Sequence, residues 1–230
     1  MAESTAQAQP VSAFSLFTKS KEVVLANLPT YAVLFILPLL MGLGANLNNG
    51  SRSPITPAFN GLDISPTQLG LGVGVAIIVF IAFIIVSVMV YALNLLAANG
   101  KKPGLDALWP FVSKFTLRII GISIVTSVII VLGLMALVVP GVIFIRRYFL
   151  APYVLIDQDL SIGEAMRESA RLTRPYPMSV WGLVGVNIIL NLPSFVPVIG
   201  WAISFVLGSL YTAAPAIRYL ELKKLNPTGK

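Results

Sequence analysis

Long apolar stretches separated by short polar segments dominate the chain and predict an all-α, polytopic membrane protein. Several of these stretches approach or exceed the ~20 residues that cross a hydrocarbon core as a helix. We predict six transmembrane helices, at residues 29–47, 69–98, 118–139, 142–156, 178–192 and 199–220. The second is longer than the core requires, so it must tilt or project beyond it. The fourth and fifth are short and suit tight hairpins.

Three amphipathic segments lead into spans and resemble one another. They cover residues 12–33, 105–125 and 162–184, and each carries an alanine, then a larger apolar residue, then a basic cluster. The aligned pairs are Ala13-Phe14, Ala107-Leu108 and Ala165-Met166. Such internal similarity indicates a repeated unit, here one interfacial helix plus one two-span hairpin, three times over. The alternative is that unrelated interfacial helices share this pattern.

The segment 161–174 gives the clearest interfacial helix. Ser161 and Glu164 fit a capping box, in which the two residues satisfy free backbone donors at a helix start. Apolar and small residues recur on one face at helical spacing, which predicts a helix lying flat on the inner leaflet. Glu164 and Glu168 are spaced to pair with the basic face at i,i+3. The buried face comprises Ile162, Ala165, Met166, Ser169 and Thr173, and the basic face Arg167, Arg171 and Arg174.

Composition and charge placement agree with a membrane protein and orient it. Charged residues make up only 11% of the chain and hydrophobic residues 57%, against roughly 25% charged in an average soluble domain. Lysine and arginine flanking spans collect on the cytoplasmic side. One side of the predicted layout holds nearly all of these residues, and the other side holds only Arg52. The basic side comprises Lys19, Lys21, Lys101, Lys102, Lys114, Arg118, Arg167, Arg171, Arg174, Arg218, Lys223, Lys224 and Lys230.

This placement predicts a multi-pass protein of the bacterial inner membrane with both termini in the cytoplasm. We expect a disordered cytoplasmic tail at 1–11, one six-span membrane domain at 12–224, and a second cytoplasmic tail at 225–230. The segment 48–68 is rich in Asn, Gly, Ser and Pro, and we expect it to be an outer loop.

The missing residue types narrow the chemistry. The chain has no cysteine and no histidine, so it cannot supply a Ser-His-Asp triad or a zinc site of the usual kind. Asp157-Gln158-Asp159 resembles a metal-binding acidic pair only weakly, and acids there also favour the positive end of the following helix. We therefore expect no catalytic residues, no metal and no cofactor.

Arg146 and Arg147 are the most informative charges, because they lie inside the predicted fourth span. A charge near the bilayer centre costs ~2.5–3.5 kcal/mol on insertion scales, and such residues face a bundle interior or a wet cavity. Asn187 and Asn191 share a face of the fifth span at comparable depth, and no span contains a carboxylate. Three interpretations remain: snorkelling to an interface, a buried structural role, or contact of Arg146, Arg147, Asn187 and Asn191 with an anion or a lipid phosphate.

Residues 139–174, "VPGVIFIRRYFLAPYVLIDQDLSIGEAMRESARLTR", resemble the core of the glycerophosphoryl diester phosphodiesterase membrane-domain family of bacteria and its uncharacterised relatives. The resemblance implies membrane architecture. It carries over no enzymatic activity, because the name comes from members fused to a soluble phosphodiesterase domain, which this chain lacks. The doubled arginine leaves open which one matches the family's single embedded arginine. The matching features are Pro140-Gly141, Arg146 or Arg147, Ala151-Pro152, Asp157, and the helix from Ser161 to Thr173 with Ser169, Leu172 and Thr173 at its end.

These observations favour a non-catalytic integral membrane protein that organises lipid or a membrane partner. We expect its partners to be membrane lipids, mainly anionic, or another membrane protein, and not nucleic acid. The sequence does not indicate an oligomeric state. The main alternative is a transporter or channel for a small anionic or amphiphilic solute. An intramembrane enzyme has the least support, because no span holds a carboxylate or a histidine.

Overall fold

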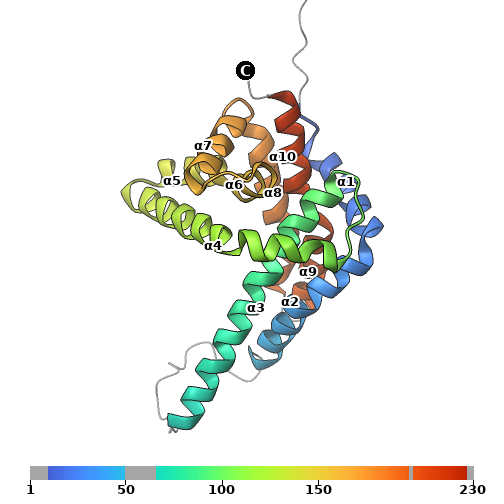
Figure 1. Cartoon of the computed structure of the whole chain (residues 1–230), viewed down its shortest axis with the longest axis vertical. Coiled ribbons are helices and arrows are strands. Elements are labelled where there is room, and N and C mark those ends of the chain that lie inside the picture. Colours follow the sequence, from blue (N-terminus) through green and yellow to red (C-terminus); the bar gives the residue numbers. More distant parts are fainter. Residues whose placement is uncertain (1–9, 50–65, 197–198, 227–230) are drawn as a thin grey trace, which may run out of the picture.

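A computed structural model describes residues 10–49, 66–196 and 199–226, and these residues fold into helices joined by short turns (Figure 1). The all-α prediction is confirmed. The predicted loop 48–68 lies mainly outside the described residues. In chain order the elements are α1 (Ala13–Ala26), α2 (Leu28–Asn49), α3 (Pro66–Ala98), α4 (Leu105–Ala136), α5 (Val138–Tyr148), α6 (Ala151–Gln158), α7 (Ile162–Thr173), α8 (Pro177–Asn191), the 3₁₀ turn η1 (Leu192–Phe195), α9 (Ile199–Tyr211) and α10 (Ala214–Leu225).

The helices have the length and apolar character of a multi-pass membrane protein. Among the described residues, five helical segments are long and apolar enough to cross a membrane. The pair α1 and α2, which bends by 97°, would make a sixth. The order of these segments follows the six predicted spans.

Two of the predicted spans are broken by a proline. The predicted span 142–156 divides into α5, which ends at Tyr148, and α6, which carries Pro152 in its first turn. The predicted span 199–220 divides in the same way, because α9 ends at Tyr211 and α10 carries Pro215 in its first turn. A proline ring clashes with the carbonyl four residues earlier. In both cases that carbonyl belongs to the last residue of the preceding helix.

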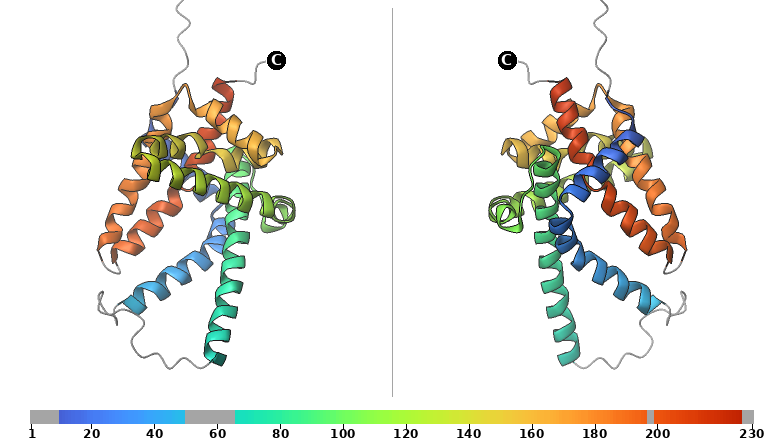
Figure 2. Two further views of the ribbon diagram at one scale, coloured as in Figure 1. Left: turned by 90° about the vertical axis from the view of Figure 1, so that its left-hand side faces the viewer. Right: turned by 90° about the vertical axis from the view of Figure 1, so that its right-hand side faces the viewer.

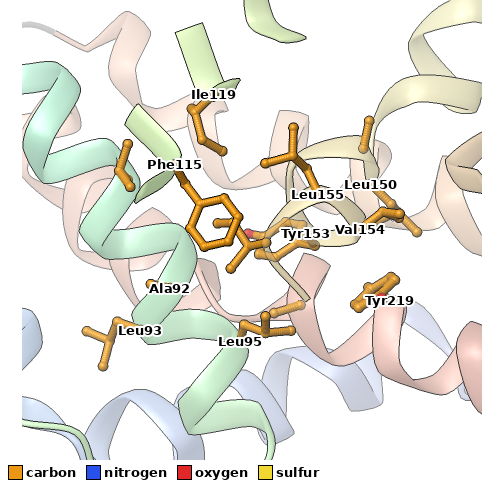
Figure 3. Packing of buried hydrophobic residues seen from close by; sticks show 14 of the residues in the cluster. Ala92, Leu93, Leu95, Phe115, Ile119, Leu150, Tyr153, Val154, Leu155 and Tyr219 are labelled. Carbon is orange, nitrogen blue, oxygen red and sulfur yellow. The ribbon is translucent and has the colours of Figure 1, made fainter. Parts of the chain in front are cut away.

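Three helices pack together at the centre of the fold. The helices α3, α6 and α10 contact one another, and their apolar side chains form the largest buried cluster. Figure 3 shows Leu93 of α3, Leu155 of α6 and Tyr219 of α10 among these side chains, with Phe115 of α4 packed beside them. A continuous apolar core therefore joins segments from the beginning, middle and end of the chain.

The remaining contacts follow the predicted threefold repeat. The three units are α1 to α3, α4 to α6, and α7 to α10, and each begins with an amphipathic segment. The first helix of each unit packs on the last helix of the preceding unit: α4 on α3, α7 on α6, and α1 on α10. The predicted register was wrong for the first unit, because Phe14 is 80% exposed while Leu16 is fully buried. The second segment also differs, since α4 continues unbroken into its span.

The ring of units closes at Val11. The Arg218 guanidinium donates from Nη2 to the Val11 carbonyl at 2.7 Å and from Nη1 to Glu221 at 2.6 Å. The Val11 amide donates to the same Glu221 carboxylate. Val11 is thus fixed against α10, which corrects the predicted disordered tail 1–11 at its last residue. Residues 1–9 lie outside the described residues. Arg218, predicted as a flanking basic residue, is 1% exposed.

The molecule divides into a head and three arms, of which the hairpin of α4 and α5 projects to the left in Figure 1 and the other two point downward in Figure 2. The head comprises 10–27, 88–119, 149–176 and 212–226. The arms are the hairpins formed by 28–49 with 66–87, by 120–148, and by the described parts of 177–211. Most exposed large apolar side chains lie on the arms. Among the described residues, every charged side chain except Arg146 and Arg147 belongs to the head.

Candidate functional site

Arg147 and the basic face of α7 line one pocket where the second arm meets the head. The pocket has a volume of about 590 Å³. No acidic side chain is among its lining residues, which are Arg147, Arg167, Ala170, Arg171, Arg174 and Pro175. The structure therefore joins two sets of arginines that the sequence analysis treated separately.

Two local features position these arginines. Arg146 and Arg147 occupy the last turn of α5, where the negative end of the helix dipole favours cations. Ser169 of α7 is buried and donates from Oγ to the Arg147 carbonyl at 2.7 Å, which fixes α7 against the end of α5. Ser169 belongs to the buried face of α7, which packs against α5 and the rest of the head, while the arginines of α7 lie on its exposed face.

The predicted capping box starts α7. Glu164 accepts hydrogen bonds from the Ser161 amide at 3.0 Å and from the Ser161 hydroxyl at 2.6 Å. These bonds, the hydroxyl bond first, hold the pKa of Glu164 below its ordinary value. The predicted Glu164–Arg167 ion pair does not form, because Glu164 caps the helix. Arg167 therefore remains available to the pocket.

Only one of the four pocket arginines has an ion-pair partner among the described residues. Arg171 pairs with Glu168 through two hydrogen bonds of 2.7 Å, as predicted, and also donates to the Asn226 carbonyl at 3.2 Å. The hydrogen bond from Arg171 lowers the pKa of Glu168. Arg147, Arg167 and Arg174 form no ion pair within the described residues, so the pocket presents three uncompensated guanidinium groups.

The other residues predicted for an anion site lie elsewhere. Arg146 does not line the pocket, and its Nε is buried without a hydrogen-bond partner. Asn187 and Asn191 are exposed on the third arm, where the Asn191 amide donates to the Asn187 carbonyl at 2.7 Å. Asn191 lines a different cavity, between α2 and α9. The structure thus brings Arg147, and none of the other three, to the basic face of α7.

The acidic turn Asp157-Gln158-Asp159 has structural partners. Asp157 accepts from the Tyr219 hydroxyl at 2.6 Å and pairs with Lys223. Asp159 ends α6 in a left-handed conformation, with φ of 51°, and pairs with Lys114 at 2.8 Å and Arg118 at 2.7 Å. The Lys114 hydrogen bond, followed by that of Arg118, lowers the pKa of Asp159. These contacts join α6 to α10 and α4 and leave neither carboxylate facing the arginine pocket.

The pocket has the chemistry of an anion site. A guanidinium group matches phosphate oxygens with two parallel N–H donors, and several guanidinium groups around one pocket provide this repeatedly. Arg147 also shares the pocket with exposed arginines, so its charge is not isolated in hydrocarbon. The sequence analysis identified every one of these arginines but did not predict that they line one pocket. Their proximity depends on the hydrogen bond from Ser169 to Arg147, which joins residues distant in the chain.

No protein-family model, curated protein or solved structure matches this chain. The resemblance to the glycerophosphoryl diester phosphodiesterase membrane-domain family therefore stays a prediction, supported by the motif in residues 139–174 alone.

Proposed function

We propose that this chain is a non-catalytic, multi-pass protein of the bacterial inner membrane that binds an anionic lipid by its phosphate group. The pocket lined by Arg147, Arg167, Arg171 and Arg174 is the observation that carries the proposal. Arg171 is held by Glu168, and the other three guanidinium groups are available to phosphate oxygens. Binding lipid at this pocket would organise anionic lipid around the protein or present it to a membrane partner.

The position of the pocket supports a lipid over a free anion. It lies where the second arm, whose outer surface is apolar, joins the charged head. A phospholipid has the same division between acyl chains and a charged headgroup, so its phosphate and its chains can be satisfied together. Basic pockets beside membrane helices on the cytoplasmic side are typical headgroup sites.

The proposed orientation places the head at the cytoplasmic surface. The positive-inside rule favours this, because lysine and arginine of the described residues concentrate in the head. Val11 and α10 lie side by side, so the first and last described segments are at the same end of the molecule. Both termini would accordingly be cytoplasmic. A cysteine introduced at Thr5 or Thr228 should react with a membrane-impermeant maleimide only after the cells are opened.

A census of copurifying lipid tests the site. The wild-type protein should copurify with phosphatidylglycerol or cardiolipin beyond their share of the membrane. Arg147→Ala combined with Arg174→Ala should lower that enrichment at least fivefold, because both remove uncompensated guanidinium groups. Lys101→Ala combined with Lys102→Ala is the matched control: it removes the same charge from exposed positions outside the pocket, and it should leave the enrichment unchanged.

Two outcomes would contradict the proposal. The arginine variant could keep the wild-type lipid, or the lysine variant could lose as much lipid as the arginine variant. The transport alternative is separated by reconstitution: saturable flux of an anionic solute in liposomes, lost with Arg147→Ala, would favour a transporter. Turnover of a lipid by the pure protein would show an enzyme.

A further inference from the structure

Two adjoining cavities lie between the arms, and their lining residues differ in type from those of the arginine pocket. One, of about 330 Å³, lies between α2 and α9, and the other, of about 260 Å³, lies between α2, α3 and α6. They share Phe35, Pro38 and Thr212 in their linings. Pockets of ~300–1,000 Å³ with mainly apolar walls and a few polar groups are typical ligand sites.

The walls of these cavities are apolar and aromatic. Trp201 and Phe205 stack with ring centroids 5.6 Å apart, and Phe35 meets Phe205 edge-on at 6.2 Å. Phe83 and Val86 of α3 line the second cavity. No charged side chain lines either cavity. These walls suit an acyl chain and disfavour a charged headgroup, which would find no counter-charge.

Hydroxyl and amide groups nevertheless line the same space. Ser204 is 5% exposed, and its Oγ is buried without a hydrogen-bond partner. The hydroxyls of Ser209 and Thr212 also make no hydrogen bond within the described residues. Serine and threonine in helices commonly bond to the carbonyl four residues back, as Ser87 does to Phe83 at 2.8 Å. A buried hydroxyl without such a bond costs free energy unless a ligand supplies one.

A fixed polar network forms one end of the space. The Tyr31 hydroxyl donates to Asn94 Oδ1 at 2.8 Å, and the Asn94 amide donates to the Tyr153 hydroxyl at 3.4 Å. Asn94 is 1% exposed and lines the second cavity with Tyr153. Because Asn94 bonds to both tyrosines, the three side chains form a neutral polar surface with no net charge.

From these features we propose that the space between the arms binds an uncharged lipid of the acylglycerol type. Its acyl chain would lie along Phe35, Trp201 and Phe205. Its hydroxyl or ester oxygen would bond to Ser204 or to the neighbouring hydroxyls. This site is independent of the arginine pocket and does not rest on the function proposed for it.

Quenching of Trp201 by a brominated monoacylglycerol tests this site. Trp109→Phe combined with Trp181→Phe leaves Trp201, which lines the cavity, as the only tryptophan. The probe, added to the full chain in detergent, should quench Trp201 with saturation, and unlabelled monoacylglycerol should reverse the quenching. A brominated lysophosphatidylglycerol of the same chain length should bind at least tenfold more weakly, because the cavity offers its phosphate no counter-charge.

Variants at glycines separate filling of the cavity from general damage. A Cβ added at Gly208, which lines the cavity, or at Gly185 of α8, which does not, would meet no atom within 4 Å. Gly208→Leu should weaken quenching at least tenfold, while Gly185→Leu should leave it unchanged. Ser204→Ala, which removes no packing atom except the hydroxyl, should weaken it about threefold. Arg147→Ala should have no effect, so failure here and failure of the arginine pocket are distinguishable.

Four results would overturn the proposal. The first is quenching that rises with probe without saturation. The second is quenching of equal strength in a variant that keeps only Trp109. The third is equal affinity for lysophosphatidylglycerol. The fourth is a folded Gly208→Leu protein with wild-type affinity. Should Gly208→Leu fail to fold, unchanged affinity in Ser204→Ala would be decisive against the site.

Discussion

The head and the arms of this protein are stabilised by different surroundings. In the head, apolar side chains from all three units are buried against one another, and most of its carboxylates bond to arginine, lysine or a helix start. On the arms, large apolar side chains face outward, and the arms contact one another at few places, such as Phe35 of α2 against Phe205 of α9 (Figures 1 and 2). The head resembles the interior of a soluble domain, whereas the arms depend on lipid to cover them.

Removing the buried Arg218 charge should produce the largest effect, and it should fall on the head. Arg218→Met removes the cation that pairs with the Glu221 carboxylate and the donor that bonds to the Val11 carbonyl. Breaking a buried ion pair from one side costs about 3–5 kcal/mol. We expect that loss in the free energy of unfolding measured in detergent. Lys224→Met, at an exposed position without an ion pair, is the control and should change it by less than about 0.5 kcal/mol. A change below 1 kcal/mol for Arg218→Met would show that the pair is not structural.

A matched pair of leucines compares the two regions directly. Leu155 of α6 is fully buried in the head, and Leu132 of α4 is 58% exposed on an arm. Leu155→Ala should lower the free energy of unfolding by about 2–5 kcal/mol, because it leaves a cavity. Leu132→Ala should change it by less than about 0.5 kcal/mol. Equal effects of the two substitutions in detergent would remove the distinction between head and arms.

The second arm contains one tight contact between protein segments, which a methyl group should disturb. A Cβ at Gly133 of α4 would lie 2.9 Å from the Gly141 Cα of α5. Small residues allow membrane helices to approach closely. Gly133→Ala should therefore cost about 1–3 kcal/mol, as overpacking does. Gly44→Ala on the first arm, where a Cβ meets no atom within 4 Å, should have little effect. Unfolding in detergent measures both, and equal results would show that α5 moves freely along α4.

Acid should produce the smallest effect and should act on the head alone. The Arg171 hydrogen bond holds the pKa of Glu168 below 4.5 in the folded protein. The ion pair therefore contributes stability above the unfolded pKa, and that contribution is lost as the pH falls through the lower folded pKa. Because Arg171 is partly exposed, the contribution should stay below about 1 kcal/mol.

Glu168→Gln measures this contribution. The unfolding free energy of this variant should differ from that of the wild type at about pH 7, and the two should match once the pH is low enough to protonate the carboxyl in the folded wild type. Glu22→Gln, at an exposed position without an ion pair, should match the wild type throughout. A difference for Glu168→Gln that persists at low pH would mean that the carboxylate is not what stabilises α7.

The sequence predicted the helices of the fold better than the contacts between them. Apolar length located the spans, and the Ser161–Glu164 spacing located the start of α7 correctly. Pro152 and Pro215 marked the two breaks in the sequence. A proline ring, however, clashes with the carbonyl four residues earlier only when the segment before it is helical. The threefold repeat was visible, yet its register failed at Phe14. Leu16 lies two residues further on, about 200° around the helix and so nearly on the opposite face, and the alignment on Ala13 took no account of which face packs on the head.

The sequence alone could not predict which charged side chains are buried. Arg218 was indistinguishable from the exposed lysines after it, since its burial depends on Val11 and Glu221 closing around it. Arg147 was recognised as unusual, but its neighbours were not the asparagines of the third arm. A long-range contact, the Ser169 hydrogen bond, brought α7 to it instead. The pocket lined by arginines is thus a product of tertiary packing.

The contact between α1 and α10 also sets the timing of assembly during synthesis. The ribosome synthesises α1 before α10, so the surface that covers Leu16 and receives Val11 does not exist until α8, α9 and α10 have emerged. Until then α1 must rest elsewhere, and its amphipathic character suits the bilayer surface. The contacts of α1 with α10 can consequently form only after α10 has been synthesised.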